Sequence, residues 1–139
     1  MYESLTVFLE PLQNESSGEW IVDKTSKGTT DDPIQMPFVA FSKNNHRFIE
    51  AVYAFEDEHP DLGLKRYSDI LEENGLSWSS KSMETTDVSL LDGRCVVALI
   101  LGSIRFDRFC EGYLKDMIDS GFVAKWLFRL KEIDDTSSM

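Results

Sequence analysis

The amino-acid sequence predicts an α+β fold, in which a small N-terminal antiparallel β-meander of two to three strands packs on a bundle of four to five helices. Short runs of β-branched and aromatic residues, separated by turn formers, lie within the first 41 positions. From Ser42 onward the apolar residues recur with helical spacing instead. The length of 139 residues fits one domain, with a β-rich part (1–41), a helical part (42–133) and a disordered tail (134–139).

Three runs in the N-terminal part predict strands. They cover residues 4–9, 19–23 and 34–41, and the loops between them are rich in Gly, Ser, Asn and Asp. Pro33 and Pro37 remove backbone donors from the third run, so this run is expected at the edge of the sheet.

The first predicted helices have clear start and stop signals. Ser42 is suited to cap a helix that ends at the His59-Pro60 pair, because the residue before a proline avoids the α region. Residues 64–73 predict a short amphipathic helix that Asn74-Gly75 ends with a left-handed residue. Residues 77–86 predict a polar loop.

The next helix is the expected centre of the bundle. Asp87 is its predicted cap, with Asp92 near its positive end. Residues 95–101 are apolar on every side, which is typical of an enclosed helix. Cys95 and Cys110 would lie on this one helix about 22 Å apart, too far for a disulfide, and both are expected to be buried thiols. Two short helices, over 113–119 and 122–133, complete the fold.

The charge balance excludes several classes of partner. Acidic residues outnumber basic ones by 25 to 14, which gives a formal net charge of -11. Direct binding of nucleic acid would need the opposite balance. No run approaches the length of a membrane span and no leader is recognisable, so we expect a cytoplasmic protein that contacts no membrane.

The sequence gives no positive indication of an enzyme or of a metal site. His46 and His59 are the only histidines and would stand at opposite ends of one helix, about 20 Å apart. No zinc, phosphate-loop or nucleophile motif occurs. We therefore expect neither a metal nor another cofactor.

Two arginines, Arg105 and Arg108, stand at the end of the most apolar helix. One interpretation is structural, because each guanidinium could pair with a carboxylate, from Glu111 or from the helix over 64–73. The other is functional: both arginines converge on a pocket for an anionic ligand.

Four further side chains are candidate site residues. In the functional interpretation of the arginines, Tyr67 or Tyr113 supplies a hydroxyl to the ligand. Trp78 lies in a serine-rich segment close to Met83, where it either covers the core or anchors an interface with another protein. Met83 is the second candidate residue of that interface.

Three segments resemble a family of small bacterial proteins known only as a domain of unknown function. They read MPFVAFS, FIEAVYAFEDEHPDLGLKRYSDILEENGLSW and RFDRFCEGYL, and the similarity extends over roughly residues 18–134. The resemblance implies a bacterial, cytoplasmic, single-domain protein, and it implies nothing about a substrate.

Two functions therefore compete. The first is a protein-interaction or regulatory module that binds a partner with a basic surface, with an affinity that falls as salt rises. The alternative is a domain or enzyme that binds an anionic small molecule at Arg105 and Arg108. A DNA-binding helix-turn-helix around Ser120-Gly121 conflicts with the net negative charge.

Overall fold

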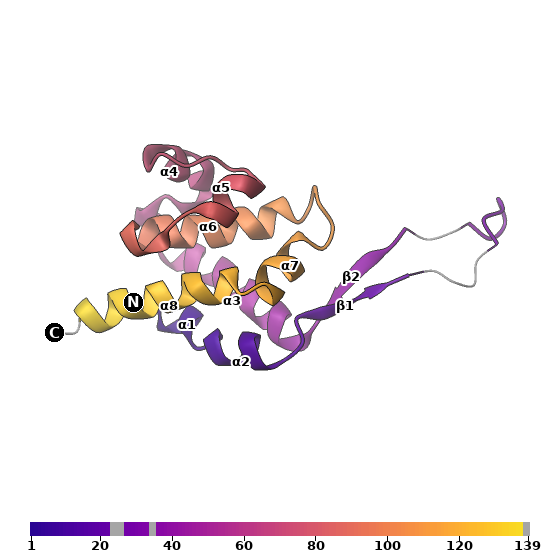
Figure 1. Ribbon diagram of the computed structural model, residues 1–139, viewed down its shortest axis with the longest axis horizontal. Coiled ribbons are helices and arrows are strands. Elements are labelled where there is room, and N and C mark those ends of the chain that lie inside the picture. The colour runs from indigo at the N-terminus through magenta and orange to yellow at the C-terminus, as the bar shows by residue number, and fades with distance from the viewer. Residues whose placement is uncertain (23–26, 34–35, 138–139) are drawn as a thin grey trace.

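The computed structural model is a bundle of helices from which a two-stranded hairpin projects (Figure 1). It describes residues 1–22, 27–33 and 36–137. The hairpin pairs β1 (Gly18–Ile21) with β2 (Phe38–Phe41) in antiparallel register. The predicted α+β class is confirmed, and the sheet has two strands in the described part of the chain.

The strand predicted over residues 4–9 is wrong. This segment belongs to two short helices, α1 (Glu3–Thr6) and α2 (Leu9–Asn14). Leu5 of α1 and Leu12 of α2 are buried, and both helices pack against α3 (Lys43–Glu58) and α8 (Phe122–Ser137). This burial overrides the β propensity of the neighbouring residues.

The hairpin covers only part of what was expected to be strand. Position 23 and residues 34–35 of the second and third predicted strands lie outside the described residues, and Pro37 precedes β2. A hydrogen bond joins the two ends of the hairpin where they meet the bundle: the backbone N–H of Ser42 donates to the carbonyl of Ser17 at 2.9 Å. The buried Asn45 amide donates to the same carbonyl at 3.1 Å and closes the base of the hairpin.

The helix predicted after Ser42 is confirmed as α3 (Lys43–Glu58). Ser42 Oγ accepts the backbone N–H of Asn45 at 3.2 Å, as an N-cap does. After His59 the chain forms the short 3₁₀ turn η1 (Pro60–Leu62). The proline therefore ends the helix where the sequence predicts.

The amphipathic segment over 64–73 is also helical, as η2 (Leu64–Arg66) followed by α4 (Tyr67–Glu73). Gly75 is left-handed, with φ of 77°, and the N–H of Leu76 reaches back to the carbonyl of Leu71 at 2.8 Å. This is the predicted glycine ending in its Schellman form.

The segment predicted as a polar loop over residues 77–86 contains a helix instead. It is α5 (Ser80–Thr85), capped by the Ser79 hydroxyl, which accepts the N–H of Ser82 at 3.2 Å. Its one buried residue, Met83, faces the core. With one buried apolar side chain in six residues, this helix is too short to show a hydrophobic period.

The cap of the central helix α6 (Gly93–Phe106) is Asp92, so the prediction of Asp87 is wrong. Asp92 Oδ1 accepts the N–H of Cys95 at 2.9 Å. Asp87 instead caps the 3₁₀ turn η3 (Val88–Leu90), which separates the two aspartates. Both residues cap a turn, and only the structure shows which turn continues as a helix.

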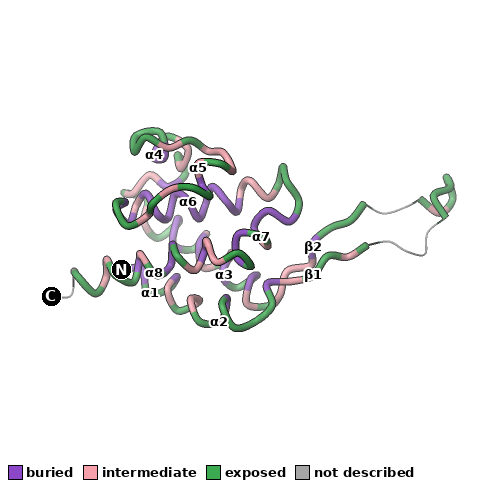
Figure 2. Tube along the Cα trace, in the orientation of Figure 1, coloured by how far each residue is buried: buried purple, intermediate pink, exposed green. Residues whose placement is uncertain are grey.

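The centre of the bundle is α6, as predicted. The helix is buried without interruption from Cys95 to Ile104 and packs against α4, α8 and the following helix α7 (Tyr113–Asp119) (Figure 2). Within α8 (Phe122–Ser137), Trp126 is fully buried. The expected division into a central helix and covering helices is therefore correct.

Two predictions about the later part of the chain are wrong. The helix α6 ends at Phe106, so Cys110 lies in a loop and is exposed, whereas Cys95 is buried as expected. The helix α8 continues to Ser137, although residues from 134 onward were predicted to be disordered. Asp134 accepts the N–H of Tyr2 at 2.8 Å, so the N-terminal segment fixes the last turns; residues 138–139 lie outside the described residues.

Candidate anion-binding pocket

The C-terminal end of α6 brings the two arginines of interest to one side of the bundle. Arg105 lies in the last turn of α6, and Arg108 follows in a turn closed by its backbone N–H on the Arg105 carbonyl at 3.2 Å. Arg105 is half-buried and Arg108 is exposed.

Both arginines line one open pocket of about 560 Å³. Its charged side chains are Glu56 from α3, Lys65 from η2, Arg105 and Arg108. Three cations and one anion give the lining a net charge of +2 in a chain whose net charge is -11. The pocket is therefore a local positive site on an acidic protein.

Aromatic side chains form the rest of the pocket lining. They are Tyr67 at the start of α4, Trp78 in the segment before α5, and Phe109 in the loop after α6. The indole N–H of Trp78 donates to the carbonyl of Gly102 at 2.8 Å, which fixes this ring against α6. The Tyr67 and Phe109 rings meet it edge-on, with centroids at 5.5 and 5.9 Å.

No carboxylate in the described part of the chain forms an ion pair with Arg105 or Arg108. Glu111, an expected partner of Arg108, instead accepts the N–H of Val39 in β2 at 2.7 Å. Glu73 of α4 is also engaged elsewhere, 3.5 Å from Arg94. The structural interpretation, in which each arginine has an internal carboxylate, does not hold for the described residues.

The Arg105 guanidinium has an aromatic neighbour. It lies 5.2 Å from the centre of the Tyr53 ring of α3, within the range of a cation–π contact. Such a contact orients the guanidinium and leaves its charge in place, so its N–H groups stay available to an anion.

The loop that carries Arg108 and Phe109 is anchored at both ends. Asp107 Oδ1 accepts the N–H of Leu114 at 3.0 Å, and burial raises the pKa of this carboxyl above its usual range. At the other end, Glu111 is bonded to β2. The two pocket residues are therefore presented by a segment tied to both α7 and the hairpin.

Two of the predicted site residues are placed elsewhere. Tyr113 is buried outside the pocket lining, against Phe106 at 4.6 Å between ring centroids, and its hydroxyl has no hydrogen-bond partner among the described residues. Burial, with a smaller contribution from the charge of Glu84, raises the pKa of Tyr113 to about 12. Met83, a candidate interface residue in the segment predicted as a polar loop, is instead in the core, where its sulfur accepts the Ser103 hydroxyl at 3.6 Å.

Sequence reasoning missed three residues of the pocket: Glu56, Lys65 and Phe109. A signal existed for Glu56, because it follows Val52 by four residues and so places a carboxylate on the buried face of α3. Lys65 and Phe109 had no distinguishing pattern, since both depend on how separate segments meet.

The described residues give no sign of a metal centre or of a membrane span. They contain no group of three or more His, Cys, Asp or Glu side chains positioned to hold a metal ion. None of the helices in the described ranges is both long enough and apolar enough to cross a bilayer.

Comparison with known proteins gives one match. Residues 72–136, from the end of α4 to α8, match a family of unknown function, whereas the resemblance in the sequence extended over residues 18–134. No curated protein and no solved structure matches the chain. The matched region contains Trp78, Arg105 and Arg108, so the part of the chain that builds the arginine side of the pocket matches the family of unknown function DUF6508.

Proposed function

We propose that this protein binds a small anionic ligand in the pocket at the end of α6. The observation that supports this proposal is the position of Arg105 and Arg108, which line an open pocket without a carboxylate partner among the described residues. Charged groups in proteins are normally paired or solvated, and a cluster of three cations within one concavity favours an anion from solution.

The chemistry of the lining suits a phosphate or a similar oxyanion. Guanidinium groups bind such oxygens through two parallel hydrogen bonds, and Lys65 adds a mobile point charge. Tyr67 also lines this pocket, and we expect its hydroxyl to supply a further donor to the ligand. A ligand of charge -2 would balance the net charge of the lining.

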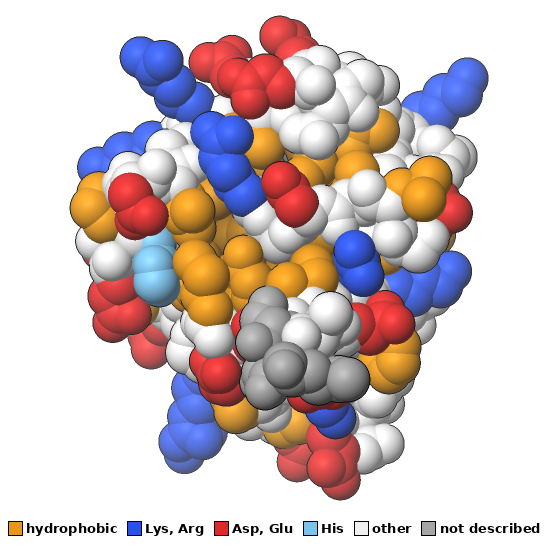
Figure 3. All heavy atoms as spheres, turned by 90° about the vertical axis from the view of Figure 1, so that its left-hand side faces the viewer, with side chains coloured by type: hydrophobic (Ala, Val, Ile, Leu, Met, Phe, Trp, Pro, Cys, Tyr) orange, Lys and Arg blue, Asp and Glu red, His pale blue; other side chains and the backbone are white. Residues whose placement is uncertain are grey.

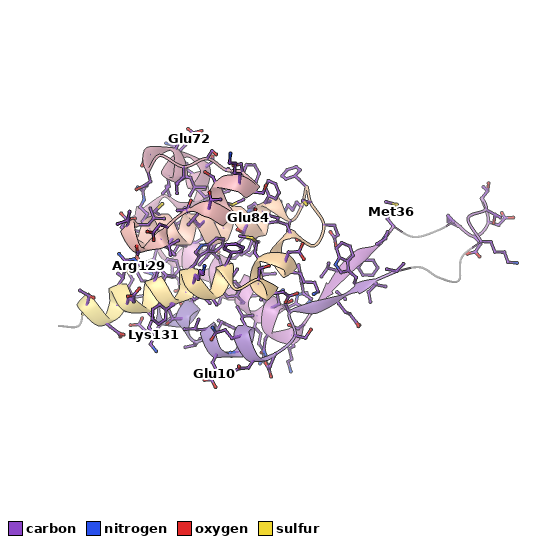
Figure 4. The ribbon with its side chains drawn as sticks, viewed as in Figure 1. Glu10, Met36, Glu72, Glu84, Arg129 and Lys131 are labelled. Carbon is purple, nitrogen blue, oxygen red and sulfur yellow. The ribbon has the colours of Figure 1, made fainter. Side chains whose placement is uncertain are left out.

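Binding of a basic protein partner is supported by net charge alone. Glu10 and Glu72 lie on opposite sides of the bundle (Figure 4). The end at which the C-terminus lies carries acidic and basic side chains around a hydrophobic centre (Figure 3). Because the negative charge is spread over these surfaces, the small-molecule proposal has the more specific structural support.

Calorimetric titration with inorganic pyrophosphate at low ionic strength tests the proposal. We expect saturable binding of one pyrophosphate per chain. Replacing either arginine (Arg105→Gln or Arg108→Gln) should weaken binding about tenfold, which corresponds to about 1.4 kcal/mol.

Arg47→Gln is the matched control, because Arg47 is an exposed arginine of α3 that does not line the pocket. It should leave the affinity unchanged. Absence of saturable binding, or an equal loss in the control variant, would contradict the proposed function.

A further inference from the structure

We propose that the anion bound here is a mononucleotide with a guanine-type ring, and that Glu56 reads the N–H donors of that ring. This inference rests on the proposed function, because it assumes that the phosphate is held by the pocket's arginines. Binding of a simple anion leaves two features of the pocket without a role, the aromatic lining and the carboxylate of Glu56. The inference gives each of them a role.

Glu56 is the first of these features. The residue is only 9% exposed, its carboxylate has no ion pair or hydrogen bond among the described residues, and its oxygens are not enclosed by protein. Glu56 therefore presents an open acceptor to the pocket that it lines. An ionised carboxylate only accepts hydrogen bonds, and beside a bound anion it would repel the ligand. A ligand that donates N–H groups to Glu56 offsets this repulsion.

The position of Glu56 separates it from part of the cationic lining. Glu56 and Lys65 also line an adjoining cavity of about 260 Å³, next to η1 and η2. Of these two cavities, Arg108 and Phe109 line the larger one, and both come from the loop after α6. The pocket therefore has an acceptor on its α3 side and an arginine on its α6 side, as a ligand with a donor group and a distinct phosphate requires.

The aromatic lining is the second feature. Phe109 is 78% exposed, so it gains nothing from the core, and yet it lies at the pocket beside the fixed ring of Trp78. Aromatic side chains next to cationic groups are the usual combination for a planar base with an attached phosphate. The pocket volume of about 560 Å³ lies within the common range for small-molecule sites, roughly 300–1,000 Å³.

Guanine fits this arrangement better than adenine. Its Watson–Crick edge carries two adjacent N–H donors, which one carboxylate can accept together. The same edge of adenine offers one amino group beside an acceptor nitrogen, and that nitrogen would face the negative charge of Glu56. The single carboxylate therefore predicts a preference between the two bases.

Calorimetric titrations with four probes test the inference: GMP, AMP, guanosine and inorganic pyrophosphate. We expect GMP to bind about tenfold more tightly than AMP and more tightly than either guanosine or pyrophosphate. Glu56→Gln should remove the preference for GMP over AMP while pyrophosphate still binds. Glu58→Gln, at an exposed residue of the same helix, is the matched control and should retain the preference.

A second variant tests the inference even if Glu56→Gln does not fold. Phe109→Ala changes an exposed side chain, so the fold should persist. This variant should bind GMP several-fold more weakly, and its affinity for pyrophosphate should be unchanged. An equal loss of affinity for both probes would overturn the role of this ring.

The outcomes separate this inference from the proposed function. If pyrophosphate binds through the arginines but GMP binds no better than AMP, the inference is overturned and the proposed function stands. If Glu56→Gln strengthens all anionic probes equally, Glu56 only competes by its charge, and the inference is again overturned. If no probe binds, both proposals fall.

Discussion

The two cysteines illustrate how the surroundings of a single residue decide its reactivity. Cys95 is completely buried in α6, and burial raises the pKa of its thiol to about 11. Cys110 is exposed in the loop that follows α6. Only the thiolate is a nucleophile, so a raised pKa keeps Cys95 in its protonated, unreactive form at neutral and mildly alkaline pH.

We therefore predict that the native protein exposes one reactive thiol. A colorimetric thiol assay at mildly alkaline pH should report one reactive group per native chain and two per chain in denaturant. Cys110→Ser should remove the native signal. A native signal that persists in this variant would show that Cys95 is accessible and that the packing described for α6 is incorrect.

At the same scale, the role of the two arginines could be predicted only as a pair of alternatives. Their position at the end of an apolar helix is visible in the sequence, and so is Tyr67 as a companion. Whether a carboxylate reaches them depends on β2, because Glu111 is bonded to Val39. The sequence carries no signal for a contact between residues separated by 72 positions.

At the scale of the elements, the helix caps allow a direct test of how a single residue of the sequence contributes to stability. Asp92 caps the long central helix α6, whereas Asp87 caps the short turn η3. Removing an N-cap acceptor costs about 1 kcal/mol, because a backbone N–H of the first turn loses its partner.

We predict that Asp92→Ala lowers the free energy of unfolding by about 1 kcal/mol, measured by urea denaturation. Asp92→Asn keeps an acceptor and should recover most of the loss. Asp87→Ala is the comparison, and its effect should be smaller because the turn that it caps does not continue into a helix. An effect of Asp87→Ala equal to that of Asp92→Ala would contradict this assignment of the caps.

The junction between the hairpin and the pocket loop allows a second test among the elements. Gly112 is left-handed, with φ of 87°, and a Cβ at this position would lie 2.3 Å from Cζ2 of Trp20. Gly121 is equally left-handed, with φ of 88°, but a Cβ there meets no atom within 4 Å. The two glycines share backbone strain and differ in the contact with Trp20.

Alanine at either glycine should lower the free energy of unfolding by about 1 kcal/mol through backbone strain alone. We predict that Gly112→Ala lowers it by at least about 1 kcal/mol more than Gly121→Ala, since Trp20 must also move. Urea denaturation of the two variants measures the difference. Equal costs would show that the hairpin does not pack on this loop in solution.

The elements that the sequence predicts correctly are those with their own start and stop signals. The helix α3 begins at a serine cap and ends at a proline, and α4 ends at a glycine. The elements missed, α1, α2 and α5, are at most six residues long. Helices of this length form through packing against the rest of the bundle, so local sequence patterns do not specify them.

At the scale of the whole molecule, the net charge of -11 destabilises the compact state through repulsion among acidic groups. Four ion pairs connect the described residues, and two of them involve the N-terminal ammonium. Most of the acidic side chains in the described ranges therefore have no cation close enough for an ion pair.

We predict that added sodium chloride raises the melting temperature at neutral pH, because salt screens this repulsion. Near the isoelectric point, at about pH 4.5, the net charge vanishes and the same addition should have little effect. Thermal denaturation followed by circular dichroism, with and without added salt at each of the two pH values, measures both changes in melting temperature. A melting temperature that falls with salt at neutral pH would contradict the charge argument.

The fold and the pocket differ in how far the sequence predicts them. The central place of α6 follows from residues 95–101, because a segment that is apolar on every side has to be enclosed. The pocket is instead assembled from α3, η2, α4 and the segments before α5 and after α6. Its composition depends on packing between distant parts of the chain, and so Glu56, Lys65 and Phe109 were missed.

A site-resolved titration tests the central claim, that Arg105 and Arg108 are free to bind an anion, most directly. Pyrophosphate would be added to the native protein while the side-chain Nε–Hε resonances of its arginines are followed by nuclear magnetic resonance. We predict that the Arg105 and Arg108 resonances shift together and saturate, whereas that of Arg47 stays in place. Equal, non-saturating shifts at all three arginines would mean that pyrophosphate acts only as a screening ion and would contradict the account.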